Sequence, residues 1–424
     1  MKRSCKNIDI TDAGTVLPWV SDCVERHCKR HDFHRLICGI GGMSEADYQA
    51  AVTSHDKSAF AVPEERIAKE ACKRIAARQL DLSPVSYRFK RDGSSGKVRR
   101  IGREGAMQQI MDYIAVYSCE DIWRRRLVPQ QASSLPGRGQ CYGTRMIQRW
   151  LKEDVRSARY AESHGLRYTP KCTYSVKMDV KDCYGSGDKD VFMRLFARDC
   201  GNADILWLWD VLLTSHRVDG YTGYMIGALV SQYAMQYMMS YAYRQVMAQH
   251  YTSHGETRQR VSHCLIYMDD ILLLGGNARE LKRAAKTLAS YMRRELHLAA
   301  KPRWSILPVR DRPVDMMGFV LHPGGTITVR PRIFVRLRRM ALRFARSRRL
   351  TISQARRVCS YKGYVYNRRI KTACTRVVKK YRLNRLFKAA ARAVSTSQRR
   401  LGHERDSILY RDYSSGGNTV HATA

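Results

Sequence analysis

The feature that most constrains this chain is a pair of adjacent acids between two apolar runs, at residues 263–276, which read HCLIYMDDILLLGG. Each run has the length of a short buried strand and two glycines end the second, so the stretch predicts a tight hairpin with Asp269 and Asp270 at its bend. Two adjacent carboxylates in apolar surroundings repel each other and lose hydration. They require a counter-charge, and a divalent metal ion is the usual one.

A third acid upstream completes a candidate metal site. Residues 173–180 alternate like a half-buried strand and carry Asp179 near its end. If this strand lies beside the acidic hairpin, Asp179, Asp269 and Asp270 converge. We predict that these acids, with Val180, hold two Mg²⁺ ions, with Mn²⁺ as the alternative ion. Two metals about 3.5–4 Å apart stabilise the attacking and leaving oxygens of a phosphoryl transfer, so the pattern predicts nucleotidyl transfer.

Three motifs carry a resemblance to a known family. Residues 267–270 (YMDD) resemble the YxDD signature of reverse transcriptases, and Asp179 with Tyr184 five residues later resembles the first catalytic motif of that family. Residues 226–232 (IGALVSQ) stand where most members carry QGxxxSP. The IGxxxSQ form is similar to that of bacterial diversity-generating retroelement reverse transcriptases, within the group II intron-like lineage.

The resemblance covers roughly residues 85–370 and implies an α+β right-hand polymerase, with fingers, a palm of antiparallel sheet and helices, and a helical thumb. We predict the following division: a helical N-terminal region at 1–84, fingers at 85–172, palm at 173–328, thumb at 329–384 and a basic, polar C-terminal tail at 385–424.

Composition agrees with a nucleic-acid enzyme. Lys and Arg number 76 against 38 acids, a net charge of +38, which predicts a polyanionic partner. The 13 cysteines lack the regular spacing of a disulfide framework, which favours a reducing compartment. No segment reaches the roughly 18 uncharged apolar residues of a membrane span, and no apolar signal segment follows the first residues. We predict a cytoplasmic protein with no membrane partner.

Cations around a Gly/Ser turn at residues 92–96 predict a hairpin that folds over a triphosphate. The resemblance implies that Lys97 and Arg99 contact the phosphates of the incoming nucleotide. Arg100 is a competing candidate, because strand alternation places it on the opposite face from Arg99. The alternative is a solvated basic hairpin.

The resemblance also assigns residues around the sugar and the base pair. Tyr184 would pack beneath the sugar and exclude a 2′-hydroxyl, and the glycines of residues 185–187 predict a looser pocket than in relatives. In a helix expected over residues 226–249, Gly227 would leave room for a base pair. Ser231 and Gln232 would lie about one turn further along the same surface.

Further positions follow from the same resemblance. Lys301 would protonate the leaving pyrophosphate, with Arg303 as its rival. Gly318 would belong to a hairpin that grips the primer end, or to another palm strand pair. Arg138 lies in a Gly-rich loop at residues 132–140 that would contact template or primer. An amphipathic helix with apolar residues at 147, 150, 151 and 155 would lead into the palm.

The N-terminal region carries an unusual series of metal-ligand types. Five such residues are separated by four, four, three and four positions: Cys23, His27, His31, His34 and Cys38. They lie on one stripe of a helix if the helix is continuous. One interpretation is a metal site. The other is a face that packs or meets RNA phosphates, because one straight helix cannot wrap four ligands around an ion.

These predictions combine into an RNA-directed DNA polymerase. Nine of the twenty residues at 330–349 are arginine, which predicts a helix that follows the phosphates of a template–primer duplex. The partners would be an RNA template, a DNA or RNA primer, dNTPs, and a small basic accessory protein or a structured non-coding RNA. The preferred role is error-prone copying in a diversity-generating retroelement. The alternative is an anti-phage defence reverse transcriptase. A non-catalytic RNA-binding scaffold is a third, which the three aspartates oppose.

Overall fold

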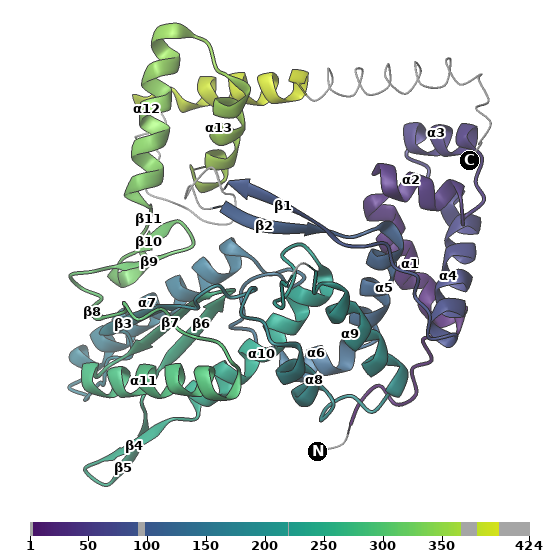
Figure 1. Cartoon of the computed structure of the whole chain (residues 1–424). Coiled ribbons are helices and arrows are strands. Elements are labelled where there is room, and N and C mark those ends of the chain that lie inside the picture. The colour runs from purple at the N-terminus through teal and green to yellow at the C-terminus, as the bar shows by residue number, and fades with distance from the viewer. Residues whose placement is uncertain (1–2, 92–97, 219, 366–379, 398–424) are drawn as a thin grey trace. The chain divides into compact units, whose positions relative to one another are not determined.

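The computed structural model describes residues 3–91, 98–218, 220–365 and 380–397 (Figure 1). The chain divides into two compact units. The first comprises Met1–Gly143 and Tyr160–Asp311, and the second comprises residues 144–159 and Arg312–Ala424. Helices combine with small antiparallel sheets, which confirms the predicted α+β class.

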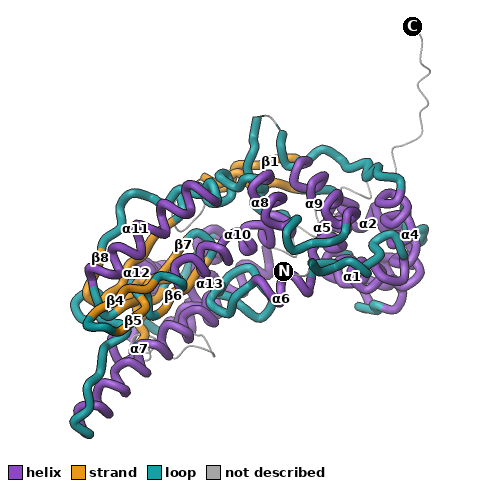
Figure 2. Tube along the Cα trace, turned by 90° about the horizontal axis from the view of Figure 1, so that it is seen from below, coloured by secondary structure: helices purple, strands orange, loops and turns teal. Residues whose placement is uncertain are grey.

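The first unit contains a four-stranded antiparallel sheet, in the order β6-β7-β3-β8. Its strands are β6 (His263–Tyr267), β7 (Asp270–Gly275), β3 (Tyr174–Asp179) and β8 (Ile306–Pro308). Every residue of β7 from 271 to 275 is buried, which explains why that run is continuously apolar rather than alternating. Helix α11 (Ala278–Glu295) packs on β3 and β7, and α10 (Leu229–Met247) packs on β6 (Figure 2).

Helices at the N-terminus pack on one another in the same unit. They are α1 (Ala13–His27), α2 (His31–Cys38), α3 (Glu45–Ser54), the short η1 (Ser58–Phe60), α4 (Ala61–Ala76) and α5 (Ala106–Tyr117). Asp12 accepts the Thr15 N–H at 2.8 Å and so caps α1. The continuous helix expected across Cys23 and Cys38 is wrong, because α1 ends at His27 and the chain starts a new helix at His31.

The rest of the first unit consists of helices and two hairpins. It contains the hairpin β1 (Ser86–Arg91) and β2 (Val98–Arg103), α6 (Glu120–Arg126), α8 (Lys189–Phe196), α9 (Ala203–Ser215) and the hairpin β4 (His250–Ser253) and β5 (Glu256–Gln259). Only the two ends of α7 (Gln140–Ser163), residues 140–143 and 160–163, belong to this unit. A buried cluster of aromatic rings joins α6, α8, α9 and α10: Trp123, Phe192, Phe196, Trp209 and Tyr237. The helix expected from residue 226 begins at Leu229, because Ala228 is still extended.

The second unit joins a three-stranded sheet to helices. Strands β9 (Val314–Met316), β10 (Phe319–Leu321) and β11 (Ile327–Val329) pair in the order β11-β10-β9. The short helix η2 (Pro323–Gly325) connects β10 to β11. Met317 and Gly318 both have positive φ, 54° and 84°, and make the tight β9–β10 turn. Helices α12 (Pro331–Ser347) and α13 (Ile352–Val365) share an apolar core with a helix at residues 383–397.

Two sequence expectations concern the whole chain. Across the part of the chain that the structure describes, no helix is both long enough and apolar enough to span a membrane. The twelve cysteines in that part are all free thiols.

Candidate active site

The sheet brings the three acids together at one end. In the antiparallel register of β3 and β7, Asp179 lies opposite Asp270. The backbone N–H of Val180 donates to the carbonyl oxygen of Asp269 at 2.9 Å, and that of Lys301 donates to the carbonyl oxygen of Asp179 at 2.8 Å. The side-by-side strands expected from the sequence are therefore observed, although about ninety residues separate them along the chain.

The turn that carries the acids is braced by a separate loop. Met268 adopts a left-handed conformation, with φ of 53°, and its N–H donates to the Ser133 hydroxyl at 2.7 Å. The same loop pairs with the edge of β6, where the Ala132 N–H donates to the Ile266 carbonyl at 2.8 Å. A non-glycine residue in this conformation costs about 1–3 kcal/mol, so it persists only where neighbours hold it.

Arg138 holds the loop that braces the acidic turn. Its guanidinium donates to the carbonyls of Val128 and Gln131, the latter at 3.0 Å. The expected contact between Arg138 and template or primer is therefore not supported, because the side chain is turned onto its own loop.

Two lysines face the carboxylates. Lys177 Nζ lies 3.1 Å from Asp270 Oδ1, and Lys301 Nζ lies 2.5 Å from Asp179 Oδ1. Burial raises the pKa of Asp270, the Lys177 ammonium opposes this shift, and the charges of Asp269 and Asp179 reinforce it. The sequence interpretation missed Lys177, although strand alternation puts it on the same face as Asp179.

The donor set fits a hard divalent cation. Three carboxylates converge, and Asp179 Oδ1 is buried without an aligned hydrogen bond even though the Lys301 ammonium is close. Carboxylate and carbonyl oxygens are the ligands that Mg²⁺ prefers. Of the two rival cations, Lys301 lies at the acids, whereas Arg303 is exposed.

The β1–β2 hairpin separates the competing arginines. Arg100 stacks on the rings of Tyr87 and Tyr221, with its guanidinium carbon 4.0 Å and 4.7 Å from their centroids. Arg99 is exposed on the hairpin. Arg99 is therefore the more accessible of the two for a phosphate, while Lys97 lies outside the described residues.

Tyr184 lies next to the acidic turn. It is largely buried, and its hydroxyl lies 3.8 Å from Met268 Sδ. The glycines that follow do not leave empty space: a Cβ at Gly187 would collide with the Tyr224 ring, and one at Gly185 with the Asp182 carboxylate. Neighbouring side chains therefore fill the space beside these two glycines, and the looser substrate pocket stays a prediction.

The residues around Gly227 that were expected to lie beside the base pair differ in their exposure. Gly227 is exposed with φ of 126°, a conformation that favours glycine, and Gln232 is half-buried. The Gly102 N–H donates to the Ile226 carbonyl at 3.1 Å, which ties this loop to β2. Ser231 is fully buried, with its hydroxyl 3.4 Å from His216 Nδ1. A direct contact between the Ser231 side chain and a substrate is therefore not supported.

A buried polar network lies behind this loop. His216 Nε2 is 3.3 Å from Glu104 Oε1, and Asp112 Oδ2 accepts the N–H groups of Leu229 and Val230 at 2.9 and 3.1 Å, which caps α10. Burial raises the pKa of Glu104 to about 8, lowers that of His216 to about 4 and raises that of Asp112. Burial therefore disfavours the charged form of both partners in the Glu104–His216 contact.

The sequence interpretation did not foresee this network. Its signal was Asp112 within an otherwise apolar helical run. A buried acid needs a donor, and here the donors are the free N–H groups at the start of α10.

The second unit exposes a row of cations on α7. The residues recur at spacings of four, three, four and three, which places them on one face, and we call them the α7 basic stripe: Arg145, Arg149, Lys152, Arg156 and Arg159. Opposite charge is sparse along this row, where Glu153 lies 3.8 Å from Arg149. The sequence interpretation recognised the apolar face of this helix and missed the stripe, although the same periodicity reveals both.

Comparison with known proteins agrees with this chemistry. Residues 128–320 match the family model described as reverse transcriptase (RNA-dependent DNA polymerase). The matched range begins in the loop that braces the acidic turn and includes all three acids and Lys301. This stretch, slightly less than half of the chain, is similar to a reverse transcriptase domain. The match indicates that the chain is an RNA-directed DNA polymerase, a nucleotidyltransferase, and it implies an RNA template, a primer and nucleotides as substrates. No curated protein matches the chain.

Proposed function

We propose that this reverse transcriptase makes cDNA by two-metal nucleotidyl transfer at Asp179, Asp269 and Asp270. The observation that carries the proposal is the register that sets Asp179 opposite Asp270, with Asp269 bonded to the next backbone N–H of β3. These carboxylates and the Val180 carbonyl would hold two Mg²⁺ ions, or Mn²⁺. The ions would supply charge stabilisation at the attacking primer oxygen and the leaving pyrophosphate.

Side chains of the protein would orient the substrates and supply a proton to the leaving pyrophosphate. The Lys177 ammonium offsets the charge of Asp270 and favours the ionised form of this carboxylate. Lys301 holds a proton at Nζ for the leaving pyrophosphate and reaches it by turning away from Asp179. Arg99 and Lys97 bind the triphosphate, and Tyr184 packs under the sugar and selects dNTPs. Gly227 and Gln232 line the base pair.

We assign the parts of a polymerase hand accordingly. The N-terminal region spans 1–84, the hairpin β1–β2 belongs to the fingers (85–172), and the sheet with β3 and β7 is the palm (173–328). Helices α12 and α13 form the thumb. The sequence predicted a thumb at 329–384 and a tail at 385–424, but the helix at 383–397 shares the apolar core of α12 and α13, so we extend the thumb to residue 397. Exposed arginines of α12 would contact duplex phosphates, and the α7 basic stripe would contact template RNA.

Error-prone copying in a diversity-generating retroelement is the role that we favour. Ile226 presents an aliphatic side chain beside Gly227, and its carbonyl is engaged by Gly102. Where other family members carry glutamine, this chain lacks a polar contact that would hold the base pair in register. A small basic accessory protein or a structured non-coding RNA would complete the complex. The alternative role is anti-phage defence.

Primer extension tests the mechanism. Purified protein is given an RNA template, a DNA primer, dNTPs and Mg²⁺. Asp269→Asn should abolish extension, and Asp190→Asn, an exposed acid at the start of α8, should preserve it. Full extension by Asp269→Asn would overturn the proposed mechanism.

Sequencing of cDNA tests the role. Ile226→Gln should lower misincorporation opposite template adenines, and an unchanged error spectrum would remove the support for error-prone copying through this residue. In cells, adenine-scattered copies of one repeat favour the retroelement, whereas repetitive or untemplated DNA favours the defence role.

A further inference from the structure

Three potential metal ligands meet between α2 and α3 in the N-terminal region. His34 and Cys38 lie one turn apart on α2, and Glu45 is the first residue of α3. One ligand atom from each lies within 4.8 Å of the other two. The ligands come from two helices that approach from different directions, so the geometric objection to a site on one straight helix does not apply.

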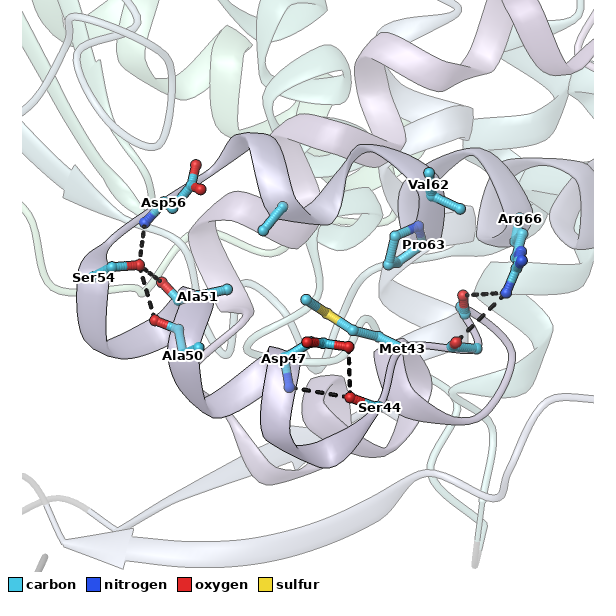
Figure 3. A pocket seen from close by; sticks show the side chains of 13 residues that line it. Met43, Ser44, Asp47, Ala50, Ala51, Ser54, Asp56, Val62, Pro63 and Arg66 are labelled. Atoms are coloured by element: carbon cyan, nitrogen blue, oxygen red, sulfur yellow. Dashed lines mark hydrogen bonds between the residues drawn. The ribbon is translucent and has the colours of Figure 1, made fainter.

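The turn that delivers Glu45 is held from both ends. The Ser44 hydroxyl accepts the Asp47 N–H at 3.1 Å and donates to the Asp47 carboxylate at 2.6 Å, which starts α3 at a defined residue (Figure 3). Across the glycine turn, Arg66 donates to the carbonyls of Gly41 and Gly42 at 3.2 and 3.5 Å. The position of Glu45 relative to α2 is therefore set by groups outside the site.

Neighbouring side chains also orient the ligands. The imidazole of His34 stacks on the Tyr48 ring, with centroids 4.2 Å apart, and its Nε2 lies 2.6 Å from Glu45 Oε2. The other carboxylate oxygen of Glu45 accepts a hydrogen bond from Gln49 at 2.9 Å. Such outer partners are the usual means by which a protein fixes ligand orientation before a metal arrives.

Two members of the sequence stripe, Cys23 and His27, lie on α1, whereas His31 lies on α2 with its ring centroid 6.4 Å from that of His34. Cys23 is fully buried, and His27 Nδ1 lies 2.9 Å from the Cys23 carbonyl, with its ring stacked on Phe33. The break between α1 and α2 thus divides the stripe, and only its last two members join Glu45.

We propose that His34, Cys38 and Glu45 bind one zinc ion, which links α2 to α3. Nitrogen, thiolate and carboxylate together suit Zn²⁺, whereas Mg²⁺ prefers oxygen ligands alone. Zinc bonds of about 2.0–2.3 Å place ligand atoms roughly 3.5 Å from one another. His34 Nε2 and Glu45 Oε2, which lie 2.6 Å apart, would separate slightly, and small rotamer changes within the 4.8 Å cluster would bring all three atoms to that spacing. Three protein ligands leave a fourth position for water. The proposal does not depend on polymerase chemistry.

Metal content and cobalt spectroscopy test the site in the full-length protein. After treatment with chelator, dialysis against zinc and then against metal-free buffer, the protein should retain one more zinc than Cys38→Ser or His34→Ala. Cys28→Ser, a half-buried cysteine of the same region outside the site, should retain as much zinc as the unmodified chain. Cobalt in place of zinc should give the intense near-ultraviolet absorption of a thiolate–cobalt bond, and Cys38→Ser should lose it.

The spectrum of the unmodified chain needs no variant, so a variant that misfolds does not obstruct the test. Absence of the thiolate–cobalt absorption, or equal zinc in the unmodified chain and a folded Cys38→Ser, would overturn the proposal. Because neither measurement involves nucleotide incorporation, failure here is distinguishable from failure of the proposed function.

Discussion

Replacing Glu104 by glutamine should reduce the loss of stability that the chain suffers as pH rises. Glu104 is 3% exposed and hydrogen-bonds His216, whose other ring nitrogen faces Ser231 at the start of α10. Burial raises the Glu104 pKa from the usual value of 4.5 to about 8. Glutamine keeps the shape and an N–H donor toward His216 Nε2, and it removes the titration.

The sign follows from proton uptake. Between pH 4.5 and 8 the folded state keeps the Glu104 proton and the unfolded chain releases it, so the stability that Glu104 contributes is complete below pH 4.5 and is lost as pH rises toward 8. The slope reaches about 1.4 kcal/mol per pH unit. His216, with its pKa lowered to about 4, acts in the opposite direction below its unfolded value of 6.5. For these two groups the net loss is concentrated above pH 6.5 and amounts to about 2 kcal/mol by pH 8. The raised pKa of the neighbouring Asp112 adds a loss of the same sign, which Glu104→Gln does not remove.

Denaturant unfolding at pH 5 to 8.5 measures this effect. Trp123 and Trp209 lie in the aromatic cluster of the same unit and report its unfolding by fluorescence. The unmodified chain should lose stability above pH 6.5, Glu104→Gln should lose much less, and Glu65→Gln, a change at an exposed acid of α4, should follow the unmodified chain. Parallel pH profiles for Glu104→Gln and the unmodified chain would refute the reasoning.

Three further predictions concern the polymerase. Lys301→Ala should lower the single-turnover rate of nucleotide incorporation by about 10²–10⁴-fold, whereas Arg303→Ala should change it little; equal losses would remove Lys301 from the proton-donor role. Gly227→Ala should lower the free energy of unfolding by about 1–3 kcal/mol, measured by heat or denaturant, because φ is 126° and the added Cβ would lie 3.1 Å from the Gly102 carbonyl oxygen. The control is Gly165→Ala, which should lower the free energy of unfolding less, because φ is 64° and the surroundings are open. Joint replacement of Arg149 and Arg156 by alanine should weaken RNA binding. It should also reduce the slope of the logarithm of the binding constant against the logarithm of the salt concentration by about one to two, as measured by filter binding. An unchanged slope would show that the α7 basic stripe does not contact phosphates.

The sequence by itself determined the local elements of the candidate site. Apolar runs on both sides of Asp269 and Asp270 leave a buried hairpin as the favoured structure, and alternation over residues 173–180 favours a strand ending at Asp179, because side-chain period and burial are local properties. The amphipathic pattern of α7 is local in the same way, and its basic stripe was readable from the same spacing.

Only the tertiary structure decided which of these elements meet. The register of Asp179 opposite Asp270, the brace of Ser133 under Met268 and the partners of Glu104 all join residues far apart in the chain. No pattern in one segment specifies such pairing, since it depends on the packing of the whole unit. The N-terminal stripe shows the same limit: its spacing implied one helix, and the break after His27 with the return of α3 instead brought Glu45 to His34 and Cys38.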